Sequence, residues 1–340
     1  MTKCSAFAGA ALLLGIALAA PSFAQPITGE EFQRQTKVLD RLKKALAAET
    51  TDGAKFAHIE RAMKGEDDAN FRHRILAIAV RIPGPELEKF LTDLLIRDDD
   101  AGLRIEAART LGRTGSEKCL TALAEAARND RTTHILFGDL IGQSSARRAA
   151  TFAIAELAAR FPKLADDAAG KLRSLPAVEH PRDRESLSDA RAQALYQVTH
   201  DEKLLTPFLD RLRSKDAKVR ESGVVAFRFL KLKVAPPELM SALGDADSSV
   251  RSWAGLALGE IGDPKTVPVL LAVAGDAKKD AGLRCNVIGA LGQMKAAAAT
   301  QPMRKLLTDE SEAVQTQAAI ALYRLTGEKV KQFPAGYNAN

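Results

Sequence analysis

An internal repeat runs through most of this 340-residue sequence. Its clearest copies read DDDAGLRIEAARTLGRTG, DADSSVRSWAGLALGEIG and DESEAVQTQAAIALYRLTG. The copies align on an arginine, here called the anchor, followed by a small or apolar residue at +3 and an apolar residue at +7. The anchors lie 29 to 44 residues apart, at Arg72, Arg104, Arg147, Arg191, Arg220, Arg251 and Arg284, with Gln315 in the eighth copy. Eight such copies predict an array of stacked units, each touching only its neighbours.

The spacing of apolar residues within a copy is that of a helix. Residues 250–261 carry them at i, i+4, i+7, i+8 and i+11, which places them on one helix face. Gly262 is typical of a helix end, and Pro264 of the first turn of a following helix. The glycines of 255–262 resemble a phosphate-binding loop, but their recurrence from copy to copy excludes a unique loop of that kind.

The pattern D-x-x-x-x-[VL]-R-x-x-A-x-x-x-L-G-x-x-G closely resembles the HEAT repeat, in the short form of the HEAT-like phycobilin-lyase proteins. The resemblance covers residues 53–327 and implies an all-α, armadillo-like solenoid. It also implies that the anchor-bearing helix is the second of each pair and lines the concave side. We therefore expect eight helix pairs, at roughly 53–82, 84–113, 116–160, 162–199, 201–231, 235–261, 263–293 and 296–326.

The same resemblance implies a structural ladder, in which turn acids and anchor arginines join neighbouring repeats. An acid stands six residues before the anchor in five copies, at Glu66, Asp98, Glu185, Asp245 and Asp309. We expect Arg104 and Arg251 to belong to this ladder together with Asp98 and Asp245, with Arg251 paired to Asp245. Such partly buried pairs fix the register between repeats. Copies three, five and seven lack the acid, so the ladder should be incomplete around them.

Residues 1–24 have the features of a signal peptide. Lys3 is followed by an apolar run over 6–20 and by PSFA, so we expect cleavage before Gln25. The mature chain would then be exported, to the periplasm or outside the cell, without an integral membrane segment. An uncleaved membrane anchor is the alternative.

The segments that flank the repeats differ from them. Residues 25–52 predict an amphipathic capping helix over the first repeat, with a capping box formed by Thr28 and Glu31. Residues 328–340 predict a mobile C-terminal tail.

The sequence contains no motif for catalysis, a metal or a cofactor. The histidines form no spaced pair of metal ligands, and there is no G-x-S-x-G, P-loop or CxxC. Cys119 and Cys285 belong to distant repeats, so we expect both to be unpaired. We therefore predict no catalytic residue, no metal site and no cofactor.

Two features predict a site for a protein partner. Long spacings place insertions at 129–145 and 174–189, in equivalent turns of consecutive repeats, and the first contains Ile135, Leu136 and Phe137. A metal site between these insertions is the weaker reading. The second feature is a set of outward-facing apolar residues at +5 or +8 from the anchor. These residues are Phe152, Tyr196, Leu256, Ile320 and Tyr323.

The net charge of +6 is concentrated in 205–233, which has eight lysines and arginines against three acids. Outside the cytosol this favours an acidic protein or an anionic envelope polymer over a nucleic acid. A solvated basic face without a partner is equally compatible. We predict an exported, non-catalytic scaffold for a protein partner. The alternatives are a lyase-like enzyme or enzyme subunit, and a binder of anionic envelope polymer through 205–233.

Overall fold

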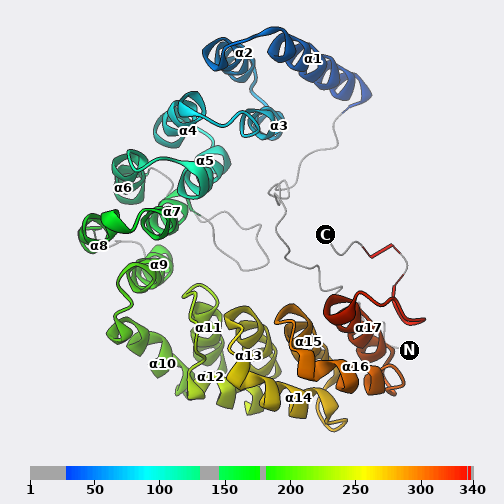
Figure 1. Ribbon diagram of the computed structural model, residues 1–340. Coiled ribbons are helices and arrows are strands. Elements are labelled where there is room, and N and C mark those ends of the chain that lie inside the picture. Colours follow the sequence, from blue (N-terminus) through cyan, green and yellow to red (C-terminus); the bar gives the residue numbers. More distant parts are fainter. Residues whose placement is uncertain (1–27, 131–144, 177–180, 335, 338–340) are drawn as a thin grey trace. The chain divides into compact units, whose positions relative to one another are not determined.

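All regular secondary structure in the described part of the chain is helical, which confirms the predicted fold class. The computed structural model describes residues 28–130, 145–176, 181–334 and 336–337, with side chains from 187 onward in the third range. The chain divides into two compact units, an N-terminal unit that ends at Asp201 and a C-terminal unit that begins at Glu202 (Figure 1). Each unit is a stack of helix pairs.

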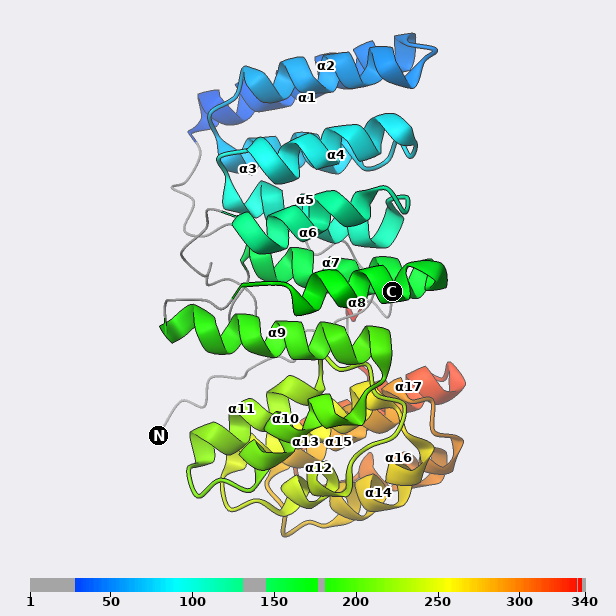
Figure 2. The same cartoon turned by 90° about the vertical axis from the view of Figure 1, so that its left-hand side faces the viewer.

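In the N-terminal unit the helices stack in parallel rows (Figure 2). A single helix precedes four pairs, as predicted. The helices are α1 (Gly29–Ala48), α2 (Asp52–Lys64), α3 (Ala69–Ala79), α4 (Pro85–Arg97), α5 (Ala101–Thr114), α6 (Cys119–Asn129), α7 (Ala146–Arg160), η1 (Pro162–Leu164), α8 (Ala165–Arg173) and α9 (Pro181–Thr199).

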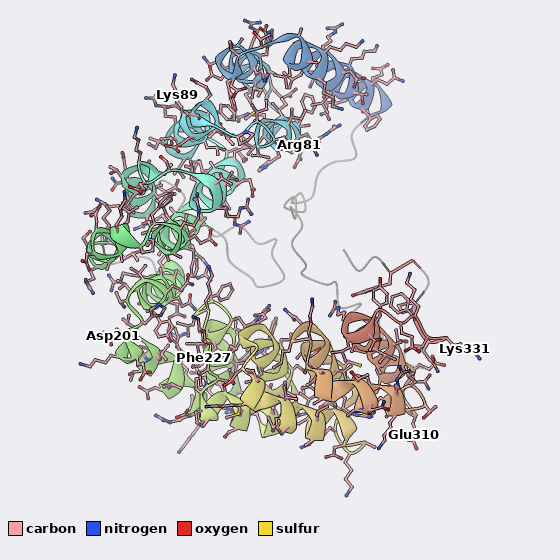
Figure 3. The ribbon with its side chains drawn as sticks, in the orientation of Figure 1. Arg81, Lys89, Asp201, Phe227, Glu310 and Lys331 are labelled. Atoms are coloured by element: carbon pink, nitrogen blue, oxygen red, sulfur yellow. The ribbon has the colours of Figure 1, made fainter. Side chains whose placement is uncertain are left out.

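The C-terminal unit consists of four further pairs in two layers (Figure 1). Its first helices are short, and three of them follow directly on a 3₁₀ turn. Proline stands at the first position of two of these first helices, at Pro237 and Pro264. Phe208 packs against Phe227, which is labelled in Figure 3, with ring centroids 6.3 Å apart. The helices are η2 (Glu202–Leu205), α10 (Thr206–Leu212), α11 (Ala217–Phe227), α12 (Pro237–Ser241), η3 (Ala242–Gly244), α13 (Ser248–Ile261), η4 (Pro264–Thr266), α14 (Val267–Gly275), α15 (Ala281–Gln293), η5 (Ala297–Ala299), α16 (Thr300–Leu306) and α17 (Glu312–Thr326).

Most second helices begin at an aspartate four residues before the anchor. The carboxylate accepts hydrogen bonds from backbone N–H groups of the first turn, which have no partner within the helix. Asp247, for example, accepts from the N–H groups of Ser249 and Val250 at 2.9 and 3.1 Å. The aspartates that act in this way are Asp68, Asp100, Asp216, Asp247 and Asp280.

The glycines of the repeat let second helices approach one another closely. A Cβ added to Gly259 would lie 2.5 Å from Ala290 Cβ on the next second helix. The same position is glycine at Gly112 and Gly292, where a Cβ would come within 2.8 and 2.9 Å of backbone atoms of Ala153 and Ala321. These glycines serve helix packing, in agreement with their exclusion from a phosphate loop.

The helix ends follow the sequence signals with one exception. Gly262 ends α13 in the left-handed conformation, with φ 69°. At the start of α1, Thr28 Oγ1 accepts from the Glu31 N–H at 3.2 Å, but the Glu31 carboxylate accepts from Arg34 and Gln35 instead of turning back to Thr28. The capping box is therefore only half formed, because a charged guanidinium is the stronger donor.

Described residues of the C-terminal tail contact the last helix pair. Phe333 packs on Tyr323, with ring centroids 4.9 Å apart, and Arg324 Nη2 donates to the Tyr337 hydroxyl at 2.8 Å. The mobility of this tail stays a prediction. Among the described helices, none combines the length and the apolar character that a membrane span requires.

The close helix approach predicts opposite effects for two glycine-to-alanine substitutions. Gly259→Ala should lower the free energy of unfolding by roughly 1–3 kcal/mol, because the new methyl overlaps Ala290. Gly244→Ala is the control, since a Cβ there has no neighbour within 4 Å and should leave stability unchanged or slightly raised. Urea unfolding followed by circular dichroism measures both. Equal stability of the two variants would contradict the close approach.

Candidate functional site

The anchor arginines connect successive repeats through both carbonyl and carboxylate groups. Arg220 Nη1 donates to the carbonyls of Ser214 and Lys215, both at 3.0 Å, in the turn before its own helix. Its Nε and Nη2 donate to the two carboxylate oxygens of Asp245, at 2.7 and 2.8 Å, in the turn of the next repeat. A planar guanidinium has enough donors to hold both turns at once.

The expected pair between Arg251 and Asp245 is wrong. Arg251 Nη1 donates to the main-chain carbonyl of Asp245 at 2.8 Å, while the Asp245 carboxylate is bound by Arg220 of the preceding repeat. The carboxylate partner of Arg251 is Asp280, at 3.0 Å. Each of these arginines therefore binds the carboxylate of the following repeat, not that of its own repeat. In its own repeat, the arginine faces the main-chain carbonyl groups of the turn before its helix.

The ladder also passes through positions where gaps were expected. Asp130, at the end of α6, accepts from Arg104 Nε at 2.7 Å, and both side chains are at most 5% exposed. Asp280 caps α15 and binds Arg251 with its other oxygen. Acids at other positions therefore fill the places at repeats three and seven. The side chain of Glu185 lies outside the described residues.

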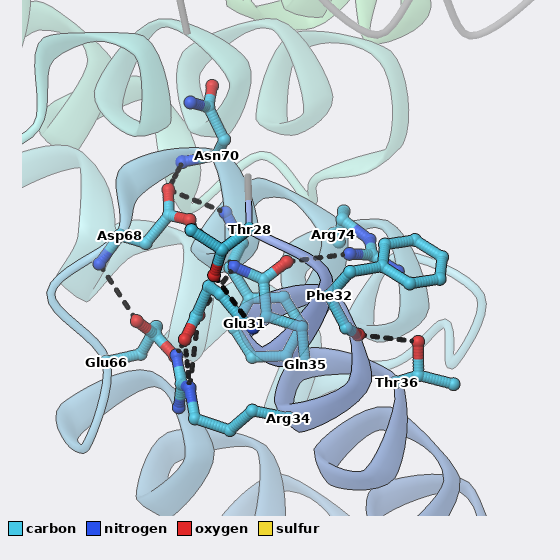
Figure 4. A network of polar contacts seen from close by, with 11 residues as sticks. Thr28, Glu31, Phe32, Arg34, Gln35, Thr36, Glu66, Asp68, Asn70 and Arg74 are labelled. Atoms are coloured by element: carbon cyan, nitrogen blue, oxygen red, sulfur yellow. Dashed lines mark hydrogen bonds and ion pairs between the residues drawn. The ribbon is translucent and has the colours of Figure 1, made fainter. Parts of the chain in front are cut away.

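The ladder continues into the N-terminal helix, which sequence reasoning missed. Arg34 on α1 donates to Glu66 Oε2 at 2.7 Å, as the anchor Arg72 does to Asp98 one repeat later (Figure 4). Beside it, buried Gln35 donates to Asp68 at 2.8 Å. The sequence contains the residues for this contact, because Arg34 and Gln35 precede a turn that carries acids. At the other end Gln315 keeps only the carbonyl contact, to Asp309 at 2.6 Å.

The ladder also determines the protonation of its acids. Hydrogen bonds from Arg220 hold the pKa of Asp245 below its usual range, and those from Arg284 lower the pKa of Asp309 in the same way. Their contribution to stability is present above the ordinary aspartate pKa of about 3.8 and is lost as the pH falls through the lower folded-state values.

The predicted outward-facing residues are half-buried rather than exposed, and one is buried. The Arg148 guanidinium covers Phe152, 4.9 Å from its ring centroid, and burial lowers the pKa of Arg148 to about 10. Tyr196 makes an edge contact with His200, at 5.9 Å between centroids. The expected exposure of Ile320 is wrong. It is 9% exposed and lies within five consecutive buried residues, so this turn of α17 is enclosed.

The remaining predicted residues are accounted for as follows. Leu256 is half-buried on α13, and Tyr323 is half-buried beneath Phe333. Ile135, Leu136 and Phe137, with most of the first insertion and part of the second, lie outside the described residues. Their grouping with Phe152 and Tyr196 stays a prediction.

Sequence reasoning missed a group of polar and charged side chains around Trp253, on α11 and α13. Trp253 Nε1 donates to Glu221 Oε1 at 3.2 Å, and the Arg228 guanidinium lies 5.2 Å from the Trp253 ring centroid. Arg228 in turn binds Glu260, with Nε at 2.7 Å from Oε2. Trp253 lies at +2 from its anchor, also on the outward side of the helix. The signal was its identity as the single tryptophan of the sequence.

Ion pairs compensate much of the basic charge of 205–233. At least four of its eight cations have carboxylate partners, one of them on the same helix and three across repeats. The pairs are Arg213–Glu238, Lys218–Glu221, Arg220–Asp245 and Arg228–Glu260.

The described side chains give little support to catalysis. Burial raises the pKa of the Cys119 thiol to about 12 and that of Cys285 to about 11, which disfavours the nucleophilic thiolate. Both thiols are free. Within the described ranges, no three histidine, cysteine or acidic side chains gather closely enough to hold a metal ion.

Comparison with known proteins identifies the repeat. A family model described as HEAT repeats matches residues 57–134, 205–281 and 277–333, more than half of the chain. Curated protein sequences gave no match.

Several solved structures are similar to the chain at low identity. Human deoxyhypusine hydroxylase is 16% identical with a TM-score of 0.33, over 88% of this chain and 99% of that one. The complex of CpcE and CpcF of phycocyanin lyase from Nostoc is 20% identical with a TM-score of 0.39, over 74% and 91%. Importin beta is 14% identical with a TM-score of 0.44, over 86% and 44%.

The buried ladder predicts a large effect for one acid. Asp309→Ala should lower the free energy of unfolding by about 3 kcal/mol, because it leaves the Arg284 guanidinium, whose side chain is 5% exposed, without its carboxylate. Glu238→Ala is the matched control, since it breaks an inter-helix pair whose arginine is 62% exposed and should have little effect. Urea unfolding compares them. Equal losses would contradict the structural role of the ladder.

Proposed function

Because the chain belongs to the family of HEAT repeats, we propose that it is a non-catalytic scaffold that binds a protein partner along its second helices. The proposal rests chiefly on one observation. Aromatic side chains on the outward side of these helices are held in place by stacked arginines, as Arg148 holds Phe152 and Arg228 holds Trp253. Tryptophan, tyrosine and arginine are the residues that most often dominate the energy of protein interfaces.

The ladder supports a scaffold function because its contacts use the anchor arginines to join the repeats. The anchor guanidiniums bind turn carbonyls and acids, so they serve the scaffold rather than a ligand. A repeated layer of helices also presents its outward residues on rigid elements, which lowers the entropy lost on binding. The insertions at 129–145 and 174–189 belong to the proposed site. The first precedes α7, which carries Phe152, and residues 181–189 of the second form the start of α9, which carries Tyr196.

The two alternatives have weaker support. A lyase-like activity would need a reactive group, and the two cysteines have raised pKa values. Binding of an anionic polymer through 205–233 would need free cations, whereas ion pairs already occupy at least half of the cations of this segment. The protein-binding function is therefore the one that the side chains favour.

We also propose that the scaffold works outside the cytoplasm, on the basis of the signal-like residues 1–24. The exported species should have the mass of a chain that begins at Gln25. Intact-mass measurement of the exported fraction checks this, with a Lys3→Glu variant to test the contribution of the basic region. Recovery of the protein with residues 1–24 still attached, in the membrane fraction, would overturn the proposal in favour of an uncleaved anchor.

A double variant tests the binding surface. Phe152→Ala with Tyr196→Ala should keep its helical circular dichroism yet lose the partners that crosslinking captures with the wild type, because it removes two aromatic contacts. Each contact of this kind is typically worth about 2 kcal/mol. Phe161→Ala is the matched control, since Phe161 is also half-buried under an arginine, 5.0 Å from its ring, but lies at the end of α7. Undiminished capture by the double variant would place the site elsewhere.

A further inference from the structure

Positive charge gathers on one layer of the N-terminal unit, apart from the segment 205–233. Helices α3, α5 and α7, the second helices of the first three pairs, contain eight arginines, no lysine and two acids. The first helices α2, α4, α6 and α8, on the other side of the stack (Figure 1), contain eight lysines and arginines and eight acids. The excess positive charge therefore belongs to the layer of second helices.

Most of these arginines lie on one side of their helices. Three of the eight are anchors, whose guanidiniums join the repeats, as Arg104 does through Asp130. The other five stand at +1, +2, +5, +9 or +13 from their anchor. At about 3.6 residues per turn, these positions fall within about 120° of one another, on the outward side of the helix. They are Arg148, Arg74, Arg109, Arg113 and Arg160.

Arg109 and Arg148 belong to neighbouring second helices and act on each other's charge. The pKa of Arg148 is lowered to about 10, chiefly by burial; Asp189 raises it in part, and the nearby positive charge of Arg109 lowers it. The Arg148 guanidinium also lies 4.9 Å from the Phe152 ring centroid. Two like charges held close together beside an aromatic ring form an arrangement that an added anionic group stabilises.

Two further arginines occupy the same position of successive repeats and are open to solvent. Arg81, labelled in Figure 3, and Arg113 both stand at +9 from their anchor. Arg113 Nη2 lies 3.3 Å from Glu106 Oε1, and the arginine side chain is 53% exposed. An ion pair so open to solvent is weak, so a carboxylate of a ligand can replace Glu106. The same position of α7 is Glu156, where the row of arginines ends.

We propose that α3, α5 and α7 bind an acidic, extended segment of the protein partner, an inference that rests on the scaffold function proposed above. Carboxylates of this segment pair with Arg81, Arg113 and Arg109, and a neighbouring apolar side chain packs on Phe152. Arginine suits both contacts better than lysine, because its planar guanidinium binds a carboxylate through two hydrogen bonds and stacks on aromatic rings.

The spacing of the helices specifies the spacing of the acids. Packed helices lie about 8–10 Å apart, and an extended chain advances about 3.3 Å per residue. Acids at every third residue of an extended segment, about 10 Å apart, therefore match arginines on successive second helices. A helical segment would need an apolar groove, whereas the outward side of these three helices is rich in arginine.

Binding of synthetic peptides to the chain that begins at Gln25 tests the proposal, with fluorescence anisotropy as the measurement. The spaced peptide carries glutamate at every third residue among serines and threonines. The block peptide has the same composition with its glutamates consecutive, and the lysine peptide replaces each glutamate by lysine. The spaced peptide should bind about tenfold more tightly than the block peptide, with an affinity that falls as salt is added, and the lysine peptide should not bind.

Charge reversal locates the site. Arg81→Glu/Arg113→Glu should weaken binding of the spaced peptide by about tenfold or more, because it replaces attraction by repulsion. Arg97→Glu/Arg173→Glu is the matched control, since it makes the same change in net charge at exposed arginines that end the first helices α4 and α8. Arg81→Gln/Arg113→Gln should give a smaller loss, and it replaces the glutamate variant if circular dichroism shows that variant to be unfolded.

Three results of the peptide measurements would overturn the proposal. They are the absence of binding by the spaced peptide, equal affinity for the spaced and block peptides, and equal weakening by the Arg97/Arg173 control. Inorganic polyphosphate is the rival ligand. Its preferential binding through Arg81 and Arg113 would overturn the assignment to a protein segment.

Failure of the proposal is distinguishable from failure of the scaffold function. Crosslinked partners are compared for the Arg81→Glu/Arg113→Glu variant and for Phe152→Ala/Tyr196→Ala. Loss of partners in both variants is the expected result. If only the aromatic variant loses them, the acidic segment is wrong and the scaffold function stands. Undiminished capture by both variants would overturn the acidic segment and the proposed binding surface together.

Discussion

The guanidinium contacts of the anchor arginines are the interaction on which the stack depends. Most of the anchors hold a carbonyl group of the turn before their own helix, and several of these also hold a carboxylate of the next repeat. One side chain then fixes both the bend within a pair and the register between pairs. Apolar packing alone would allow neighbouring alanine-rich helices to shift along one another, because successive alanines present similar surfaces. A buried, bidentate charge pair has a single geometry. The ladder therefore supplies the specificity that the core lacks.

Close packing and the ladder reinforce each other in the C-terminal unit. Gly259 and Gly292 bring α13, α15 and α17 into near backbone contact, which shortens the distance that Arg251 and Arg284 must span. Small residues and arginines thus recur in the same repeat because close helix packing brings each arginine within reach of its partner. The outward side of the helices remains available for aromatic residues such as Trp253, whose orientation is set by Arg228.

The fold could be predicted almost completely from the sequence, whereas the ladder and the surface could not. The same helical pattern occurs in eight copies, so the ends of the helix pairs can be predicted closely, as at Gly262. The partner of Arg251 was missed because spacing within a copy says nothing about which repeat a long side chain faces. Burial of Ile320 was missed because helical periodicity places a residue on a side, but what covers that side depends on tertiary contacts. Trp253 was missed because it lies at +2 from its anchor, which is not among the positions that helical periodicity places farthest from the core.

The double role of Asp280 has a consequence for how the molecule comes apart. One carboxylate oxygen caps the start of α15 and the other holds Arg251 on α13, so fraying of the first turn of α15 also releases the preceding repeat. Elsewhere two separate acids share these tasks, as Asp245 and Asp247 do, and a helix start can loosen without releasing its neighbour. Under a pulling force, the repeats of α13 and α15 should consequently separate in a single step rather than in sequence.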